Sequence, residues 1–285
     1  MTLKNSIFDS KSEIKVLKQL RSTWTGKVGI YNHVPVANVV NIPNLSGYKK
    51  SQIEYLWKTN FDYVIASEED KNFGEPLLII EFDGLGEGYS LDGEYKQLRE
   101  TEDPNRDWKL NFKSQICEES GVPLVIVSYP ETELIDDKFT VIDGIVGEVL
   151  ADRNFTERFN NEIHVLNKQL KDIQDPELRQ HYIEMYGIER EVEEQIKNNP
   201  IAFESNRLRN LLIKNKILNT WGYSFSKDGF YISCEYFANL HNGIQLSEKA
   251  QIREVNCRGF ESSSLVEEIA QLQLLRKIAK QHGLN

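Results

Sequence analysis

Cysteine is scarce in this sequence, and long apolar runs are missing. The 285 residues include only 3 cysteines, far apart at positions 117, 234 and 257. Their odd number and wide spacing argue against a disulfide framework and a zinc knuckle, and indicate a reducing compartment. No stretch approaches the roughly 18 apolar residues of a membrane span, and the polar start MTLKNSIFDSKSE has no apolar signal core. We therefore expect a cytoplasmic protein with no membrane partner.

Positive charge is also in short supply. The formal net charge is -10, and residues 1–150 hold 16 Lys and Arg against 25 Asp and Glu. Phosphate contacts require local positive charge, so a chain of this composition is a poor general binder of nucleic acid. A nucleic-acid hypothesis therefore needs a local basic surface, and it should account for the acids, for instance as metal ligands.

Metal-binding and nucleophilic motifs built on histidine or cysteine are not visible. None of the 5 histidines, His33 among them, has zinc-ligand spacing to another His or Cys. We expect all five to be structural or surface residues. Cys117 falls on the apolar side of an expected helix and is expected to be packed rather than nucleophilic.

The order of apolar patterns predicts an α/β protein. Residues 11–21 and 106–119 have helical spacing, whereas residues 28–31, 34–40, 61–65, 77–83 and 122–128 are β-branched or continuously apolar and predict strands. Continuous apolar strands interrupted by a helix indicate a mixed sheet flanked by helices. The second half predicts helices over 155–198, 205–219 and 263–281, and short strands over 221–226, 229–234 and 251–257. We therefore expect two domains, 1–150 and a mainly helical α+β region, 151–285.

Three carboxylates coincide with expected strands and point to metal chemistry. Asp62 lies in a short strand, and Glu81 and Asp83 close the apolar run Leu-Leu-Ile-Ile. Residues two apart on a strand project to the same side, so a neighbouring strand carrying Asp62 would complete a group of three acids. A hard cation such as Mg²⁺ removes the repulsion between them. The alternative is that Asp62 caps a strand while the other two are solvated residues at a strand end.

The motifs resemble the PD-(D/E)XK restriction-endonuclease-like nuclease superfamily, in its E-x-D-G branch, which includes short-patch-repair-like endonucleases. The resemblance rests on an acid in the first helix, an Asp in a short strand, hydrophobic-Glu-x-Asp-Gly, a basic helix and a Gly-hydrophobic-Pro-Leu strand. The matching positions are Glu13, Phe61-Asp62-Tyr63, Ile80-Glu81-Phe82-Asp83-Gly84, Lys113 and the segment that begins at Gly121. They cover roughly residues 5–130, and imply a restriction-endonuclease-like mixed sheet.

The resemblance also implies roles for individual residues. Asp62 and Glu81 would bind Mg²⁺, or Mn²⁺ in its place, with Asp83 as a further ligand, and Glu13 would support the site. Asp83 stands where many members carry a lysine, so the basic residue would come from the next helix. Lys113 fits that role best by its spacing to the following glycine, and Lys109 is the second candidate. Asp107 is a further acid on the same helix.

One segment without acids provides the basic surface that a nucleic-acid hypothesis needs. Residues 205–227 contain basic side chains followed by aromatic ones that could stack on bases. The candidate nucleic-acid residues are Arg207, Arg209, Lys214, Lys216 and Trp221. The alternative is an amphipathic helix and hairpin whose cations pair with nearby acids.

These observations favour a Mg²⁺-dependent endonuclease that hydrolyses phosphodiester bonds, with DNA as substrate, in repair, restriction or anti-phage defence. The second half would hold substrate, contact a protein partner or support a homo-oligomer. Two alternatives stay open. One is a catalytically inactive nuclease-fold module for binding or assembly, which Asp83 at the lysine position favours. The other is a phosphohydrolase acting on small nucleotides, which would tolerate the acidic surface better.

Overall fold

The computed structural model of the chain describes residues 11–44, 47–84, 86–89, 94–97 and 105–284. The chain forms two compact units. Unit 1 consists of residues 1–142, 228–231 and 252–258, and unit 2 of residues 143–227, 232–251 and 259–285. In the part of the chain that the structure describes, no helix is both long and apolar enough to cross a membrane.

Unit 1 is built on a mixed four-stranded sheet in the order β1-β2-β3-β6. Its strands are β1 (Gly29–Pro35), β2 (Asn60–Ala66), β3 (Pro76–Phe82) and β6 (Leu124–Val127). The first three pair antiparallel, and β3 pairs parallel with β6. The parallel pair needs a crossover, which contains helix α3 (Arg106–Glu119). The prediction of a mixed α/β fold is therefore confirmed.

The central strand β3 is buried along nearly its whole length, as its continuous apolar sequence predicts. Leu78, Ile79 and Ile80 are fully buried in the sheet. Helix α1 (Lys11–Trp24) buries Leu17 and Leu20 at helical spacing. This core holds the ends of β2 and β3 in a defined register.

Smaller elements complete unit 1. Helix α2 (Lys50–Lys58) precedes β2, and a two-stranded sheet pairs β4 (Gly86–Tyr89) with β5 (Tyr95–Gln97). Short 3-10 turns η1, η2, η3 and η4 occupy Val36–Asn38, Ile42–Asn44, Asp70–Asn72 and Tyr129–Thr132.

The structure corrects two local predictions in unit 1. The strand expected over residues 34–40 is wrong beyond Pro35, because the chain turns into the 3-10 turn η1 there. Proline has no backbone N–H to extend a strand ladder, which accounts for the end of β1. The loop expected over residues 41–50 gives way at Lys50 to helix α2, whose first turn is supported by a 2.8 Å hydrogen bond from the Lys49 N–H to Gln52 Oε1.

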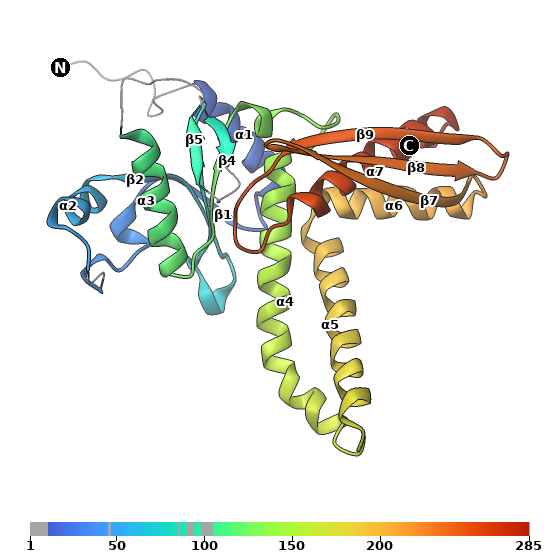
Figure 1. Cartoon of the computed structure of the whole chain (residues 1–285), viewed down its shortest axis with the longest axis horizontal. Coiled ribbons are helices and arrows are strands. Elements are labelled where there is room, and N and C mark those ends of the chain that lie inside the picture. Colours follow the sequence, from blue (N-terminus) through green and yellow to red (C-terminus); the bar gives the residue numbers. More distant parts are fainter. Residues whose placement is uncertain (1–10, 45–46, 85, 90–93, 98–104, 285) are drawn as a thin grey trace. The chain divides into compact units, whose positions relative to one another are not determined.

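Unit 2 combines a helical hairpin with a sheet backed by helices. Figure 1 shows α4 (Val141–Gln169) and α5 (Pro176–Asn198) running side by side as the two arms of the hairpin. Asp175 caps α5 by accepting from two backbone N–H groups, directly before a proline at the first helical position. Helix α4 begins fourteen residues before the expected start at residue 155, and the expected domain boundary at residue 150 falls inside it.

The rest of unit 2 is a three-stranded sheet with two helices. Its elements are α6 (Pro200–Lys214), β7 (Leu218–Asp228), β8 (Tyr231–Leu240), β9 (Gln245–Arg253) and α7 (Ser262–Gln281). The sheet order is β7-β8-β9. A 2.9 Å hydrogen bond from Gln271 on α7 to the buried Tyr236 on β8 joins helix and sheet. Helix α6 ends at Lys214 rather than 219, because β7 already begins at Leu218.

Candidate active site

Asp62 and Glu81 lie opposite each other on neighbouring antiparallel strands. The register pairs Tyr63 with Ile80 and Val64 with Ile79, and its continuation by one residue places Asp62 across from Glu81. Residues opposite each other in an antiparallel pair project from the same face of the sheet. The Phe82 N–H donates to Asp62 Oδ2 at 2.8 Å, which fixes one oxygen of this carboxylate against the end of β3.

Lys113 on α3 donates hydrogen bonds to both carboxylate oxygens of Glu81. Its Nζ donates to Oε1 at 2.9 Å and to Oε2 at 2.8 Å, and it also donates to the Asn60 carbonyl at 2.6 Å. Glu81 is 2% exposed and Lys113 6% exposed, so this is a buried ion pair. A buried pair of this kind is held by its hydrogen bonds, because desolvation of both charges opposes it.

Burial dominates the acid–base properties of the pair. Desolvation raises the pKa of Glu81 to about 7, although Lys113 opposes the rise and Asp62 adds to it. For Lys113, burial alone would lower the pKa, but the charge and hydrogen bonds of Glu81, with Tyr55 and Asp62, outweigh burial and raise the pKa above its ordinary value. Lys113 is therefore a cation at neutral pH and compensates negative charge rather than accepting a proton.

Asp62 also has a raised pKa, for which burial is again the largest cause. The Phe82 N–H and the charge of Lys113 oppose this rise, whereas the charge of Glu13 adds to it. Glu13 on α1 is tied to the same strand, because the Tyr63 hydroxyl donates to its backbone carbonyl at 2.7 Å. The structure thus brings together four residues that the sequence singled out: Glu13, Asp62, Glu81 and Lys113.

His33 is a member of this group that sequence reasoning missed. It falls between Asn32 and Val34, which pair with Tyr63 and Phe61, so it stands at the level of Asp62 on β1. Its Nε2 lies 3.3 Å from Glu13 Oε2, and its backbone has the unusual φ of 52°. Non-glycine residues with positive φ are uncommon and recur at functional sites. No local sequence pattern marked His33, because its place beside Asp62 follows from the register of β1 against β2.

Asp83 has other partners. It is 1% exposed, and its Oδ1 accepts from Arg106 Nε at 3.2 Å. The charge of Asp83 also adds to the raised pKa of Tyr95, for which burial is the larger cause. Its position just after the end of β3 directs it toward Arg106 and Tyr95. Among the described residues, Asp83 does not form with Asp62 and Glu81 a group of three placed to hold a metal ion.

Helix α3 also carries Asp107 and Lys109, the other two residues of this helix that the sequence analysis named. Asp107 has a raised pKa, caused by burial first and by the charge of Asp83 second. Lys109 lies one turn before Lys113 and is half-buried. Of the two candidate lysines, Lys113 is the one in contact with Glu81.

The residues present fit only one mode of metal binding. Within the described residues, no group of three or more His, Cys, Asp or Glu side chains is placed to hold a metal ion. A closed protein cage is therefore not formed. Magnesium, however, commonly uses one or two carboxylates and takes its remaining ligands from water and substrate phosphate. Asp62 and Glu81 are hard oxygen donors on one face of the sheet, and their chemistry fits that mode.

The pKa of Glu81 offers a direct test of the ion pair. Replacing Lys113 by Met should raise the pKa of the Glu81 carboxyl above its value of about 7, because the change removes the cation that favours the ionised form. Carbon-detected NMR titration of the side-chain carboxyl measures the shift. Lys109→Met is the matched control and should leave this pKa in place. An unchanged or lower pKa in Lys113→Met would contradict the pairing.

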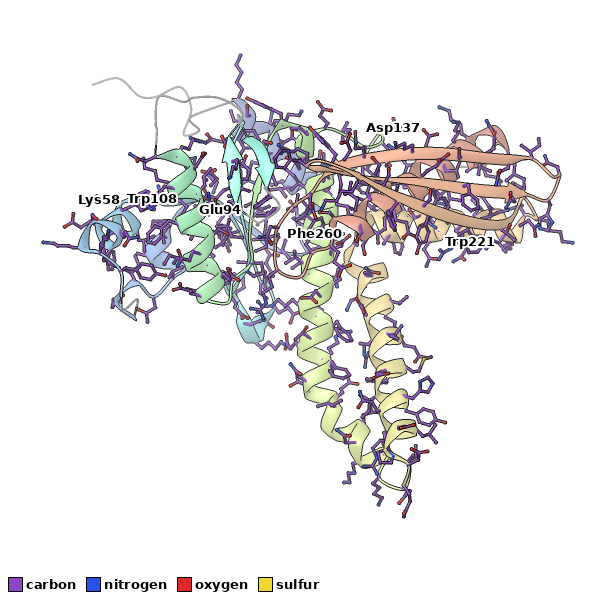
Figure 2. The ribbon with its side chains drawn as sticks, viewed as in Figure 1. Lys58, Glu94, Trp108, Asp137, Trp221 and Phe260 are labelled. Atoms are coloured by element: carbon purple, nitrogen blue, oxygen red, sulfur yellow. The ribbon has the colours of Figure 1, made fainter. Side chains whose placement is uncertain are left out.

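The candidate nucleic-acid residues all lie in unit 2, and two of them have protein partners. Arg207 forms an ion pair with Glu204 at 2.8 Å. Arg209 lies over the ring of Trp221, 5.5 Å from its centroid, and Trp221 on β7 is 41% exposed (Figure 2). Lys214 and Lys216 are exposed. The amphipathic-helix alternative therefore applies to Arg207, while two lysines and an aromatic ring face solvent.

Comparisons with known proteins add a family match without an activity. A search of the curated proteins and a search of the solved structures both found no match. A family model described as "Protein of unknown function (DUF2726)" matches residues 5–143, slightly under half of the chain. This span contains Glu13, His33, Asp62, Glu81 and Lys113, so unit 1 is similar to that family over the segment that carries the candidate site.

Proposed function

We propose that this protein is a metal-dependent nuclease of the PD-(D/E)XK restriction-endonuclease-like kind, and that it hydrolyses phosphodiester bonds in DNA. One observation carries the proposal. Asp62 and Glu81 face each other across β2 and β3, and Lys113 donates to both oxygens of Glu81. The element order helix, three antiparallel strands, helix and parallel strand supports the same proposal, because it matches the order of motifs on which the resemblance rests.

Each residue has a chemical task in this proposal. Asp62 and Glu81 would hold Mg²⁺ or Mn²⁺, and such an ion can supply an attacking hydroxide and stabilise a leaving oxygen. Lys113 donates to both oxygens of Glu81, and in this proposal it would supply positive charge where a phosphate gains negative charge. Glu13, with His33 at 3.3 Å, positions the β1 side of the site next to Asp62.

A second candidate is an inactive module that keeps this fold for binding or assembly. The observation that favours it is the occupation of both Glu81 oxygens by Lys113, because a cation would have to compete with that ion pair. Repair, restriction and anti-phage defence are settings open to both candidates.

A cleavage assay tests the proposal. The full chain is incubated with supercoiled DNA, linear DNA, RNA and small nucleotides, each with Mg²⁺, Mn²⁺ or EDTA. The proposal expects metal-dependent cleavage of DNA that EDTA abolishes. Cleavage of nucleotides alone would indicate the small-nucleotide phosphohydrolase. No cleavage with either metal, together with no Mn²⁺ binding in calorimetry, would favour the inactive module.

The exposed lysines predict how the salt dependence of DNA binding should change. Replacing both Lys214 and Lys216 by Gln should reduce the slope of log affinity against log salt by about 2, since each phosphate contact contributes about 0.9. Fluorescence anisotropy of labelled duplex DNA at several salt concentrations gives the slope. Lys58→Gln, an exposed lysine on α2 (Figure 2), is the control and should leave it unchanged. Equal slopes in all three proteins would place the DNA contact elsewhere.

A further inference from the structure

Unit 2 contains an acidic cavity that the nuclease proposal does not use. The cavity has a volume of about 350 Å³ and is bounded by α4, the end of α5 and the segment that leads into α7. Four of its lining residues are acids: Glu148, Asp152, Glu191 and Glu261. None of the residues lining it, all of which the structure describes, is a lysine or an arginine. The wall therefore carries uncompensated negative charge and selects for a cation.

A smaller hollow of about 220 Å³ continues from this cavity. The two share Gln195 and Ser264 in their walls. The smaller one adds Glu267 and Glu268 from α7, and it contains one cation, Arg209. Acidic groups therefore line two adjoining hollows, rather than converging as a single group of three.

Glu148 shows that the charge of this site lacks an internal partner. The residue is 5% exposed, and its Oε2 accepts a long hydrogen bond, 3.3 Å, from the Glu261 N–H. Its Oε1 is buried, and among the described residues no group donates to it. Buried polar atoms are normally hydrogen-bonded, so an orphaned carboxylate oxygen beside a cavity points to a ligand.

Burial and neighbouring carboxylates oppose the ionisation of Glu148 and Glu268. The pKa of Glu148 lies well above its ordinary value, through burial first and the charge of Glu268 second. Burial also raises the pKa of Glu268 to about 8, against the effect of a 2.6 Å hydrogen bond from Asn199. A bound cation would relieve both effects, because it favours the ionised carboxylates.

The shape and lining of the site distinguish the kind of cation. Within the described ranges, no group of three or more His, Cys, Asp or Glu side chains is placed to hold a metal ion. The volume is also many times that of one water molecule, about 30 Å³. Phe260 provides an aromatic wall at the start of the α7 segment (Figure 2), and such a ring can contact alkyl groups or an ammonium. We propose that this site in unit 2 binds a linear polyamine, whose ammonium groups pair with successive carboxylates while its alkyl segments lie along Phe260.

Calorimetric titration of the full chain with spermidine at constant ionic strength tests the proposal. We expect saturable binding, and at least about a tenfold loss of affinity in Glu148→Gln, because the change removes one charge-assisted contact to an ammonium group. Glu189→Gln is the matched control. It removes the same charge from the same hairpin at a residue that does not line either hollow, and should bind like the wild type.

The release of protons on spermidine binding provides a second readout. Spermidine binding should favour the ionised form of Glu148, so this carboxyl group should release its proton on binding. The affinity for spermidine should therefore rise with pH, and the heat of binding should depend on the ionisation enthalpy of the buffer. The charges of Glu268 and Glu261 act on this group. The other charged residues that line the two hollows are Asp152 from α4, Glu191 from α5, Glu267 from α7 and the cation Arg209 from α6. In Glu148→Gln the proton release should fall.

Four results would overturn the proposal. The first two are the absence of saturable spermidine binding and equal spermidine affinity in the wild type and Glu148→Gln. The third is tighter binding of trilysine than of spermidine. The fourth is that Mg²⁺, at the same concentration of positive charge, competes for the site as well as spermidine does. If Glu148→Gln does not fold, the exposed Glu191→Gln replaces it, and should weaken binding several-fold. Because the site lies wholly in unit 2, these results do not depend on the nuclease proposal.

Discussion

Replacing Asp62 by Asn should lower Mg²⁺-dependent cleavage at least about 10³-fold. A bound metal supplies several kcal/mol of transition-state stabilisation, and each 1.36 kcal/mol corresponds to a tenfold change in rate. The amide oxygen of Asn can still accept the hydrogen bond from the Phe82 N–H, so the end of β3 should stay in place. Single-turnover cleavage of labelled DNA measures the rate, and calorimetry with Mn²⁺ should show weaker binding.

A surface variant separates this effect from a general loss of protein. Glu94, directly before β5, is an exposed acid paired with Lys96 at 3.9 Å (Figure 2), and Glu94→Gln should cleave like the wild type. Glu81→Gln should lose activity to a similar extent as Asp62→Asn, since both carboxylates belong to one site. Wild-type cleavage by either Asp62→Asn or Glu81→Gln would refute the assignment of the site.

Replacing Glu131 by Ala should destabilise unit 1 by about 3–5 kcal/mol, the usual cost of leaving one member of a buried ion pair without its partner. Arg253 Nε donates to Glu131 Oε1 at 2.9 Å, and Arg253 also donates to the Gly86 carbonyl at 2.9 Å and contacts Ser128. Both charged side chains are buried. The unfolding midpoint should fall by roughly 10 °C, which thermal unfolding followed by circular dichroism would show.

Two control variants show whether the loss of stability comes from the buried ion pair. Glu248→Ala breaks the exposed pair with Lys277, whose atoms are 2.9 Å apart, and should cost less than about 1 kcal/mol. The double variant Glu131→Leu and Arg253→Met removes both buried charges, and should be more stable than Glu131→Ala alone. A Glu131→Ala protein as stable as the wild type would show that the pair contributes little.

The sequence was sufficient where local patterns coincide with tertiary packing. Helix α3 begins and ends where its pattern predicted, at residues 106 and 119, and α7 differs from its predicted bounds by a single residue at its start. The apolar run of β3 predicted a buried strand ending in acids, and the structure has it. In unit 2, strand β9 was placed several residues too late, because its exposed residues alternate with buried ones and lack a continuous apolar run.

By itself, the sequence determined the α/β class and the burial of the central strands, because strand periodicity and apolar runs encode which side chains share a face. The meeting of Asp62 with Glu81 depended on the pairing of β2 with β3. Only the tertiary structure decided that Lys113 rather than Lys109 reaches Glu81, that Asp83 turns to Arg106, and that His33 joins Glu13. The same holds for the Arg253–Glu131 pair, whose members are 122 residues apart. Contacts of this kind depend on strand register and helix rotation, which place distant segments within hydrogen-bonding reach, and no local pattern contains that information.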